Sequence, residues 1–540
     1  MMPAAAPSGP AELGAVVRQA LADAGLPDRT PTFERPRQRD HGDWATNVAL
    51  TLAKPVGRSP REIAEMIVDK LVLPSDVSSV NIAGPGFINI HLSHAALEQI
   101  VLACVSQGDA WGRTRQGEGR RANVEFVSAN PTGPLHVGAG RWAAAGDAIA
   151  SLLEATGWDV HREYYLNDAG NQLDLFGASV AAIVRGEEPP EHGYRGAYIT
   201  ELASDLDEDA AAEAGQITEA AYRRMLERIK ATMHSIRVEF DEWFSERALH
   251  ESGAVEDVVA KLRTGGHVYE EDGALFLRTT DFGDDKDRVL IRGNGRPTYF
   301  AADCAYMASK ISRGYDLCIY LLGADHHGYV SRLKAIAAAM DLAPGTIEVI
   351  IGQLVNLYRE GVEVRMSKRT GEMVTFDELI DEVGPDAARY TFLRTSLDVT
   401  LAFDIAEVVR QDRENPVYYI QYSHARIAGI MRTATERGVA PKTAADAQLG
   451  LLTHATEEEL IRRIATFPES VAYAAQERAP HKIARFAEEL AEGFHRFYTE
   501  CQVVGEDEEL TRARYWLCVA TRQTLINALG LLGVSAPDRM

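Results

Sequence analysis

Two short segments of the chain place potential phosphate-binding side chains beside glycines and prolines. The first, Ser128–Arg141, follows a run that alternates apolar and polar residues. Its prolines, Pro131 and Pro134, delay a helix until the turn is complete. We expect His136 to lie in the first turn of a long helix, where unpaired N–H groups attract anions, and Gly138 to let a flat ring lie against the backbone. This pattern favours a nucleotide phosphate site; a proline-rich loop with a capping histidine is the alternative.

The second segment, Gly361–Gly371, is a short basic stretch between two glycines. It contains Arg365, Lys368 and Arg369, although residues 111–411 have a net charge of −17. The glycines favour a hinged flap, and cations on a flap could stabilise a pyrophosphate leaving group. A solvated turn is the alternative interpretation.

The elements around these segments alternate between strands and helices, which predicts a parallel sheet with crossover helices. Ligands of such sheets bind beyond the carboxyl ends of the strands. The predicted strands are 122–128, 158–165, 287–291, 316–323 and 347–355. The predicted helices are 135–156, 168–185, 215–235, 300–313 and 328–340.

Length and charge divide the chain into three parts. The 540 residues are 46% hydrophobic, which excludes a disordered chain, and their net charge of −23 excludes a global basic field. Residues 1–110 and 412–540 are each near neutral, with a net charge of −3. Breaks in the pattern near Gly108 and Pro416 agree with domains 1–110, 111–411 and 412–540. The last domain shows helical periodicity, as at Ile483, Phe486, Leu490 and Phe494.

The cysteines and the hydropathy exclude two further classes of protein. The five cysteines are far apart and form no C-x-x-C motif, which argues against a disulfide framework or a cysteine zinc site. No apolar stretch approaches the ~18 residues that a membrane span needs. The first ten residues lack the pattern of a secretory signal.

Both segments, and several others, resemble class I aminoacyl-tRNA synthetases. Ser128–Arg141 is similar to the HIGH motif of that class, and Gly361–Gly371 is similar to its KMSKS motif. The closest resemblance is to the bacterial arginyl-tRNA synthetase family, and it covers nearly the whole chain. Further stretches that resemble this family are Gln38–Asn47, Gly84–Asn89, Tyr164–Gln172 with its N-D-x-G-x-Q pattern, Tyr299–Asp303, Leu322–Gly328, the D-A-L-R-like Gly384–Arg389, Asn415–Arg426 and Leu531–Met540.

The resemblance implies a multidomain α/β protein. It has a Rossmann-like parallel-sheet catalytic domain with a helical insertion, an α+β N-terminal tRNA-binding domain and an all-α C-terminal anticodon-binding bundle. The implied activity is that of an arginine–tRNA ligase. ATP and L-arginine give arginyl-adenylate and pyrophosphate, and the arginyl group then passes to the 3'-terminal adenosine of tRNA(Arg), releasing AMP. The resemblance also implies Mg²⁺ with ATP, no protein-bound zinc, a monomer and a cytoplasmic location.

The implied site residues fall into three groups, with His136 and Lys368 as the catalytic residues. Carboxylates and an aromatic face suit a planar guanidinium. Those for arginine are Asn130, His136, Glu246, Tyr299 and Asp303. Those for ATP are His136, Gly138, Gly323, Asp325, His327, Met366, Ser367 and Lys368. Those for tRNA are Arg35, Arg37, Arg39, Tyr418, Tyr422 and Arg426. Asn167, Asp168 and Gln172 match a family motif without an assigned role.

The chain departs from the family pattern where Ala139 replaces the second histidine of HIGH. We expect activity to survive, with Arg141, Lys368 or Mg²⁺ supplying the missing phosphate contact. Three other interpretations stay open: a class I synthetase of another specificity, a small-molecule adenylyltransferase, and a catalytically silent tRNA-binding protein. His326 and His327 could also be metal ligands.

Overall fold

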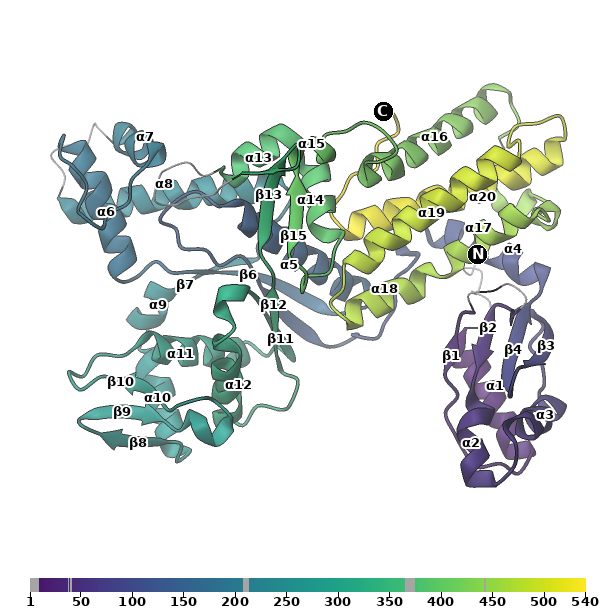
Figure 1. The fold of residues 1–540 in the computed structure, drawn as a ribbon, viewed down its shortest axis with the longest axis horizontal. Coiled ribbons are helices and arrows are strands. Elements are labelled where there is room, and N and C mark those ends of the chain that lie inside the picture. The colour runs from purple at the N-terminus through teal and green to yellow at the C-terminus, as the bar shows by residue number, and fades with distance from the viewer. Residues whose placement is uncertain (1–8, 37, 39–40, 207–212, 365–373, 441–442) are drawn as a thin grey trace.

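The computed structural model describes residues 9–36, 38, 41–206, 213–364, 374–440 and 443–540 (Figure 1). Its centre is a five-stranded sheet in which all neighbouring strands are parallel, in the order β12-β11-β5-β6-β7. The strands are β5 (Arg121–Glu125), β6 (Asp159–Leu166), β7 (Glu242–Ser245), β11 (Leu317–Gly323) and β12 (Ile347–Gly352). The chain moves outward from β5 in both directions, so the strand order switches between β5 and β11. Such a switch point is where open α/β sheets bind ligands.

Helix α5 (Val137–Ala155) follows β5 and is buried along most of its length. Its sequence is rich in alanine and glycine, which lets neighbouring aromatic rings approach its backbone closely. A Cβ added at Gly146 would lie 2.1 Å from the ring of Phe126, and one added at Gly140 would lie 2.3 Å from the ring of Phe376. The small residues therefore allow this helix to occupy the middle of the domain.

Two further units complete the catalytic part of the chain. A helical insertion after β6 consists of α6 (Asn171–Val184), α7 (Ala197–Asp205) and α8 (Ala214–Ser235). A second unit, with its own apolar core, contains an antiparallel sheet β10-β9-β8. Its elements are α9 (Glu246–Glu251), α10 (Ala254–Thr264), β8 (Val268–Glu271), β9 (Ala274–Leu277), β10 (Arg288–Ile291), α11 (Tyr299–Ser312) and α12 (Tyr329–Ala339).

After β12 the chain forms a small sheet, β14-β13-β15, and three helices that connect to the last domain. These elements are β13 (Val355–Arg359), β14 (Val362–Glu363), α13 (Phe376–Val383), α14 (Pro385–Leu393), β15 (Leu401–Asp404) and α15 (Ile405–Val408). The last domain is a helical bundle of α16 (Pro416–Glu436), α17 (Ala455–Ala465), α18 (Phe467–Gln476), α19 (His481–Glu500) and α20 (Glu508–Leu531).

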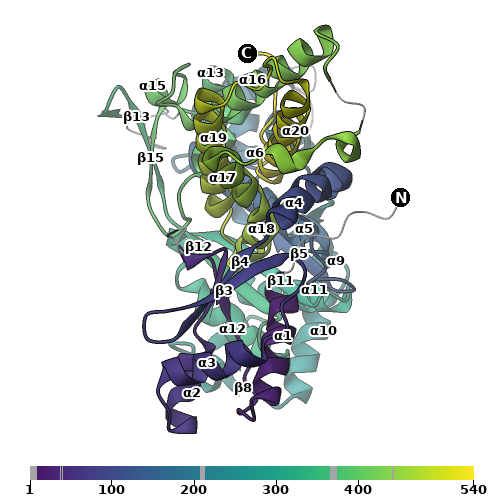
Figure 2. The same cartoon turned by 90° about the vertical axis from the view of Figure 1, so that its right-hand side faces the viewer.

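The N-terminal domain is an antiparallel sheet, β1-β2-β4-β3, whose core includes residues of three helices. Its elements are α1 (Pro10–Asp23), β1 (Phe33–Glu34), β2 (Trp44–Thr46), α2 (Val48–Val56), α3 (Pro60–Lys70), β3 (Val77–Ala83) and β4 (Phe87–Leu92). The following helix, α4 (His94–Gln107), belongs to the core shared by the catalytic domain and the bundle, with Leu97, Ile100 and Cys104 buried. Figures 1 and 2 show α4 lying along the bundle while the sheet domain extends away from it.

The D-A-L-R-like stretch fastens the C-terminal residues to the catalytic domain. The buried guanidinium of Arg389 donates to the carbonyl oxygens of Leu532 (2.9 Å) and Ile236 (2.7 Å) and pairs with Asp147 of α5. Asp386, three residues earlier, accepts hydrogen bonds from the backbone and the hydroxyl of Ser535. The D-A-L-R-like stretch thus connects three other parts of the chain: α5, the end of α8 and the C-terminal residues.

The expected fold class is confirmed, with two differences in the central sheet. The run 287–291 was expected among the parallel strands, but it forms β10 of the separate antiparallel sheet. The fifth parallel strand is instead the short β7, which the alternation of apolar residues does not reveal. The domain boundary at residue 110 stays a prediction, and α4 packs on the bundle rather than on the N-terminal sheet. None of the described helices is both long and apolar enough to cross a membrane.

We predict that Arg389→Leu lowers the free energy of unfolding by about 3–5 kcal/mol, because it leaves buried acceptors and a carboxylate without their partner. Denaturant unfolding of the full chain measures this change. Arg394→Leu is the control, since Arg394 ends the same helix but its side chain is 52% exposed in its ion pair with Glu488. We expect it to change the free energy by less than about 1 kcal/mol. Equal effects of the two substitutions would contradict the role of Arg389.

Candidate active site

His136 lies at the start of α5, directly beyond the carboxyl end of β5. It precedes the first helical residue, with extended φ and ψ of −90° and 162°, and its Nδ1 accepts a hydrogen bond from the Ala139 N–H at 3.3 Å. The imidazole therefore caps the helix, as in the alternative interpretation of the sequence, while remaining at the helix N-terminus where anions bind. A Cβ added at Gly138 would lie 2.9 Å from two atoms of this ring. Glycine at 138 is what allows the imidazole to fold back.

The chain downstream of the basic segment is attached to the His136 turn. Thr375 forms an isolated antiparallel bridge with His136, and the Phe376 N–H donates to the Leu135 carbonyl oxygen at 2.8 Å. The ring of Phe376 is fully buried against Gly140. His136 and Thr375, which are 239 positions apart in the sequence, thus meet at the switch point of the sheet.

Three of the predicted ATP-binding residues, Met366, Ser367 and Lys368, lie outside the described residues. Lys368 precedes Thr375 by seven positions.

Arg141 does not face the nucleotide side of this turn. Its side chain is buried, and its guanidinium donates to the carbonyl oxygens of Ser396 (2.8 Å), Gln353 (2.9 Å) and Val399 (2.9 Å). The expectation that Arg141 replaces the donor lost at Ala139 is therefore wrong. The two terminal nitrogens of the guanidinium join α5 to the loops before β13 and β15.

The turn after β11 carries the other predicted ATP-binding residues. Asp325 and His327 are exposed there, at the carboxyl end of a strand next to the switch point. A Cβ added at Gly323 would lie 2.7 Å from the Asp325 carboxylate, so glycine leaves room for that side chain. Among the described residues, the one group with metal-ligand geometry does not include His326 or His327.

The carboxylates of Asp303, Glu246 and Glu125 lie close enough to affect one another's charge, and with Tyr299 they make up a group of side chains, the acidic pocket. Tyr299 begins α11 and is 61% exposed, while Asp303 lies one turn later. Glu246 is buried at the first position of α9. Desolvation, together with the neighbouring carboxylates of Glu246 and Glu125, raises the pKa of Asp303 to about 7. Desolvation is also the main cause that raises the pKa of Glu246.

Glu125 is a member of this pocket that the sequence interpretation missed. Its buried carboxylate accepts hydrogen bonds from Lys310 Nζ at 2.7 Å and from Ser128 Oγ at 3.1 Å. A glutamate at the end of an otherwise apolar strand, directly before the first chemical segment, is the signal that could have found it. Tyr165 of β6 faces the same carboxylates, which contribute to raising its pKa after the larger effect of burial.

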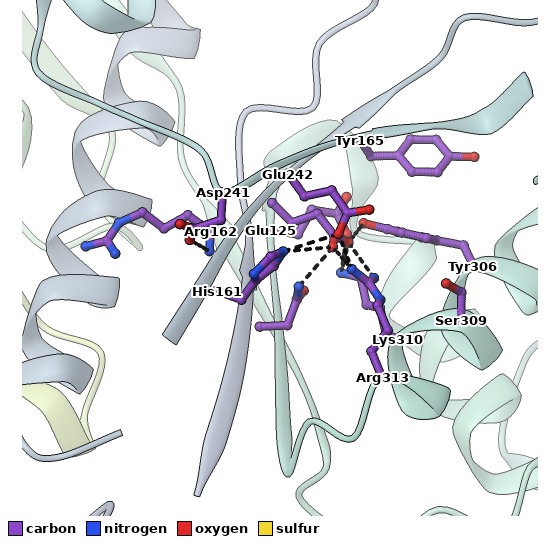
Figure 3. Close-up of polar contacts among 12 residues, drawn as sticks. Glu125, His161, Arg162, Tyr165, Asp241, Glu242, Tyr306, Ser309, Lys310 and Arg313 are labelled. Carbon is purple, nitrogen blue, oxygen red and sulfur yellow. Dashed lines mark hydrogen bonds and ion pairs between the residues drawn. The ribbon is translucent and has the colours of Figure 1, made fainter. Parts of the chain in front are cut away.

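A network of buried charges lies behind the pocket (Figure 3). Glu163 of β6 pairs with Arg313 and accepts a hydrogen bond from Tyr306, and Lys310 Nζ lies 3.6 Å from it. Burial alone would raise the pKa of Glu163, but the two cations lower it to about 2.

The same network contains the candidate metal group of the described residues, formed by His161, Glu163 and Glu242. The Arg313 guanidinium forms ion pairs with both carboxylates, and Figure 3 shows it directed at Glu242. The Arg313 guanidinium thus supplies the positive charge that a metal ion would supply between these two carboxylates. The arrangement is that of a salt-bridge network.

Asn130 lies on the loop between β5 and α5, and the N-D-x-G-x-Q segment holds it. The Asn167 side-chain amide donates to Asn130 Oδ1 at 2.6 Å, and the Asn130 amide donates to Gln172 Oε1. A Cβ added at Gly170, whose φ is +87°, would lie 3.1 Å from the Tyr299 hydroxyl. The segment therefore contacts two of the residues predicted to bind arginine.

The residues predicted to bind tRNA lie on the N-terminal domain and on α16. Arg35 forms a two-bond ion pair with Glu469 of α18 and lies 4.0 Å from the ring centroid of Trp44. Arg37 and Arg39 are outside the described residues. The contact of Arg35 with tRNA stays a prediction. In this structure the Arg35 guanidinium joins the N-terminal domain to the bundle.

Tyr418 and Tyr422 share one face of α16, as their spacing predicts. Their rings are stacked with centroids 6.5 Å apart, and the exposed Arg426 lies 5.5 Å from the Tyr422 ring and 5.1 Å from that of Tyr498. Tyr419, by contrast, stacks on His495 at 4.7 Å, which is the packing role that the sequence left open for one of these tyrosines.

Comparisons with known proteins agree with this arrangement over the whole chain. Residues 11–92 match the family described as the arginyl tRNA synthetase N terminal domain, and residues 420–540 match the DALR anticodon binding domain. Residues 101–392 match the catalytic domain of tRNA synthetases class I (R). The arginine–tRNA ligase of Frankia alni is 50% identical over 544 residues, covering 97% of this chain and 98% of the relative.

Solved structures show the same fold at lower identity. The Thermus thermophilus arginyl-tRNA synthetase is 22% identical, with a TM-score of 0.79 over 99% of this chain and 100% of its own. The Plasmodium falciparum arginyl-tRNA synthetase is 16% identical, with a TM-score of 0.73 over 98% and 99%. The Frankia relative and the three domain matches show that this chain belongs to the arginyl-tRNA synthetase family of class I.

Proposed function

We propose that this chain activates L-arginine with ATP and transfers the arginyl group to the 3'-terminal adenosine of tRNA(Arg). The observation that supports this most is the acidic pocket of Glu125, Glu246 and Asp303 next to a helix N-terminus that suits a phosphate. One end of such a site is complementary to a guanidinium and the other to a nucleotide. Arginine is the amino acid whose side chain is a permanently charged planar fork.

The arginine side chain would enter the acidic pocket, with Asp303 and Glu246 accepting its N–H donors and Tyr299 lying against it. Asn130 and His136 would face the amino-acid backbone and the α-phosphate. This orientation brings the arginine carboxylate to the α-phosphorus, so that attack forms the mixed anhydride and releases pyrophosphate. Holding both reactants in one geometry is a large part of the rate enhancement of such a reaction.

ATP would bind as its Mg²⁺ complex across the turn of Gly323, Asp325 and His327, with its ring near Gly138. Negative charge develops on the departing pyrophosphate, and we assign its stabilisation to Lys368 with Met366 and Ser367 of the basic segment. With Arg141 excluded as a donor, Lys368 and Mg²⁺ are the groups left to compensate for Ala139.

The arginyl group would then pass to a ribose hydroxyl of tRNA. The stacked tyrosines and Arg426 of α16 suit single-stranded anticodon bases, which proteins read by stacking and by hydrogen bonds to base edges. For Arg35, Arg37 and Arg39 we propose phosphate contacts with another part of the tRNA. We further propose a cytoplasmic monomer without bound zinc.

Arginine-dependent ATP–pyrophosphate exchange, measured with all twenty amino acids in the presence and absence of tRNA, tests the proposal as a whole. Exchange with arginine alone among the amino acids is the expected result. Exchange with another amino acid would indicate a different specificity. Folded protein without any exchange would indicate a silent tRNA-binding protein.

The Lys368→Ala substitution should slow adenylate formation by roughly 30- to 1000-fold, equivalent to about 2–4 kcal/mol for one lost preorganised donor. The KM for arginine should change little, since the role assigned to Lys368 is toward the phosphates and not toward the arginine side chain. Pre-steady-state formation of adenylate measures the effect. Lys261→Ala on the exposed side of α10 is the control, and a normal rate in Lys368→Ala would exclude the assigned role.

The apparent KM for arginine should rise as the pH falls below about 7. The Asp303 carboxyl has a pKa of about 7 in the unliganded protein, and its ionised form binds the guanidinium better. Because protons then compete with arginine, we expect a KM about 10-fold higher at pH 6 than at pH 8. The KM for ATP serves as the internal reference. Asp303→Asn should raise the KM for arginine and flatten this pH dependence; an unchanged KM from pH 8 to pH 6 in the natural chain would contradict the assignment.

Arg426→Ala should raise the KM for tRNA by roughly 5- to 50-fold, the range expected for the loss of one stacking contact with a base. The effect should shrink in the exchange reaction when tRNA is saturating. Arg437→Ala, an exposed arginine at the other end of α16, is the matched control. Equal sensitivity of the two variants would point to general electrostatic attraction instead of a contact by Arg426.

A further inference from the structure

The N-D-x-G-x-Q segment, Asn167–Gln172, has no role in the proposed chemistry, yet it lies between two predicted arginine-binding residues. It connects the carboxyl end of β6 to α6, next to the end of β7, where Leu166 is paired with Ser245. Glu246 is the next residue of the chain. The segment therefore adjoins both the loop that holds Asn130 and the helix that begins with Glu246.

The buried carboxylate of Asp168 binds the residues on either side of Glu246. It accepts hydrogen bonds from Ser245 Oγ at 2.6 Å and from the Arg247 backbone N–H at 2.9 Å. The Arg247 guanidinium in turn donates to the Asp168 carbonyl oxygen at 3.1 and 3.2 Å. The first turn of α9 is thus held from both sides of Glu246 by a single residue.

Helix α8 of the insertion supports Asp168 from behind. The Tyr222 hydroxyl donates to the Asp168 carboxylate at 3.3 Å, and Glu219 pairs with the Arg247 guanidinium at 3.0 Å. The helical insertion therefore contributes two contacts to the network that holds the start of α9.

The charge of Asp168 argues that its role is geometric. Asp168 and Glu246 are both acidic, and the Asp168 charge contributes to raising the pKa of Glu246, after the larger effect of burial. A residue selected only to stabilise the Glu246 carboxylate would be neutral or basic. An acceptor with three donors is instead what fixes the backbone of a helix start.

We propose that Asp168 is a positioning residue for arginine recognition, because it fixes the start of α9 and so directs the Glu246 carboxylate into the acidic pocket. Asn167 and Gln172 of the same segment fix the Asn130 amide by its oxygen and its nitrogen, and Gly170 leaves room for Tyr299. One segment thus sets the guanidinium end and the backbone end of the arginine site relative to each other. This inference rests on the proposed function.

Asp168→Asn in the full chain tests the proposal, because an amide of the same shape presents one acceptor instead of two. In arginine-dependent ATP–pyrophosphate exchange with tRNA, we expect the KM for arginine to rise about 10- to 100-fold, the range for loss of a charged hydrogen-bond partner. The KM for ATP and the kcat at saturating arginine should stay within about 3-fold of the natural chain. Asp174→Asn, an exposed aspartate in the first turn of α6, is the matched control.

A double-mutant cycle with Glu246→Gln separates positioning from an independent effect. If Asp168 acts through Glu246, the double variant should have about the same KM for arginine as Glu246→Gln alone. The proposal would be overturned if the increase in the KM for arginine in the double variant equalled the product of the two single increases. It would also be overturned if Asp168→Asn raised the KM for arginine and the KM for ATP equally. Ser245→Ala removes one of the same hydrogen bonds and takes the place of Asp168→Asn if that variant does not fold. If the natural chain shows no ATP–pyrophosphate exchange in the presence of arginine, the proposed function is refuted. That result is distinct from a double-mutant cycle that contradicts the role of Asp168.

Discussion

One buried lysine offsets the negative charge of the carboxylates at the centre of the parallel sheet. Lys310 is fully buried, bonded to Glu125 and close to Glu163, and its ammonium faces the rings of Tyr306 and Tyr320 at 4.5 and 4.0 Å. Isolated buried charges cost several kcal/mol, so these groups are stable only together. Because Lys310 belongs to α11, the pairing also fixes the helix that begins with Tyr299. The proposed recognition of arginine and the stability of the sheet thus depend on the same contacts.

Contacts distant from the pocket join the other domains to this centre. The D-A-L-R-like stretch, Gly384–Arg389, joins α5 to the C-terminal residues. The Arg35–Glu469 pair joins the N-terminal sheet to the bundle. A second pair, Arg462–Asp43 at 2.6 Å, lies at the same junction. Arg389 and Arg35 each make more than one hydrogen bond across a boundary, which the planar donor fork of arginine permits.

The sequence predicted the parts of this protein that have a local signature. Alternation and helical period located most elements of the central domain, and the HIGH-like turn located His136. It could not predict β7, since four residues of mixed polarity have no period, nor the antiparallel pairing of β10, since pairing partners are set by tertiary contacts. The phosphate contact predicted for Arg141 was wrong. The sequence alone does not distinguish an arginine that binds a phosphate from one that donates hydrogen bonds to buried carbonyl groups.

The attachment of Thr375 to the His136 turn joins the starts of two helices. His136 caps α5, and Thr375 caps α13 by accepting a hydrogen bond from the Glu378 N–H. The bridge between these two caps therefore couples their geometry, and a substitution that breaks it would disturb the first turns of both helices together.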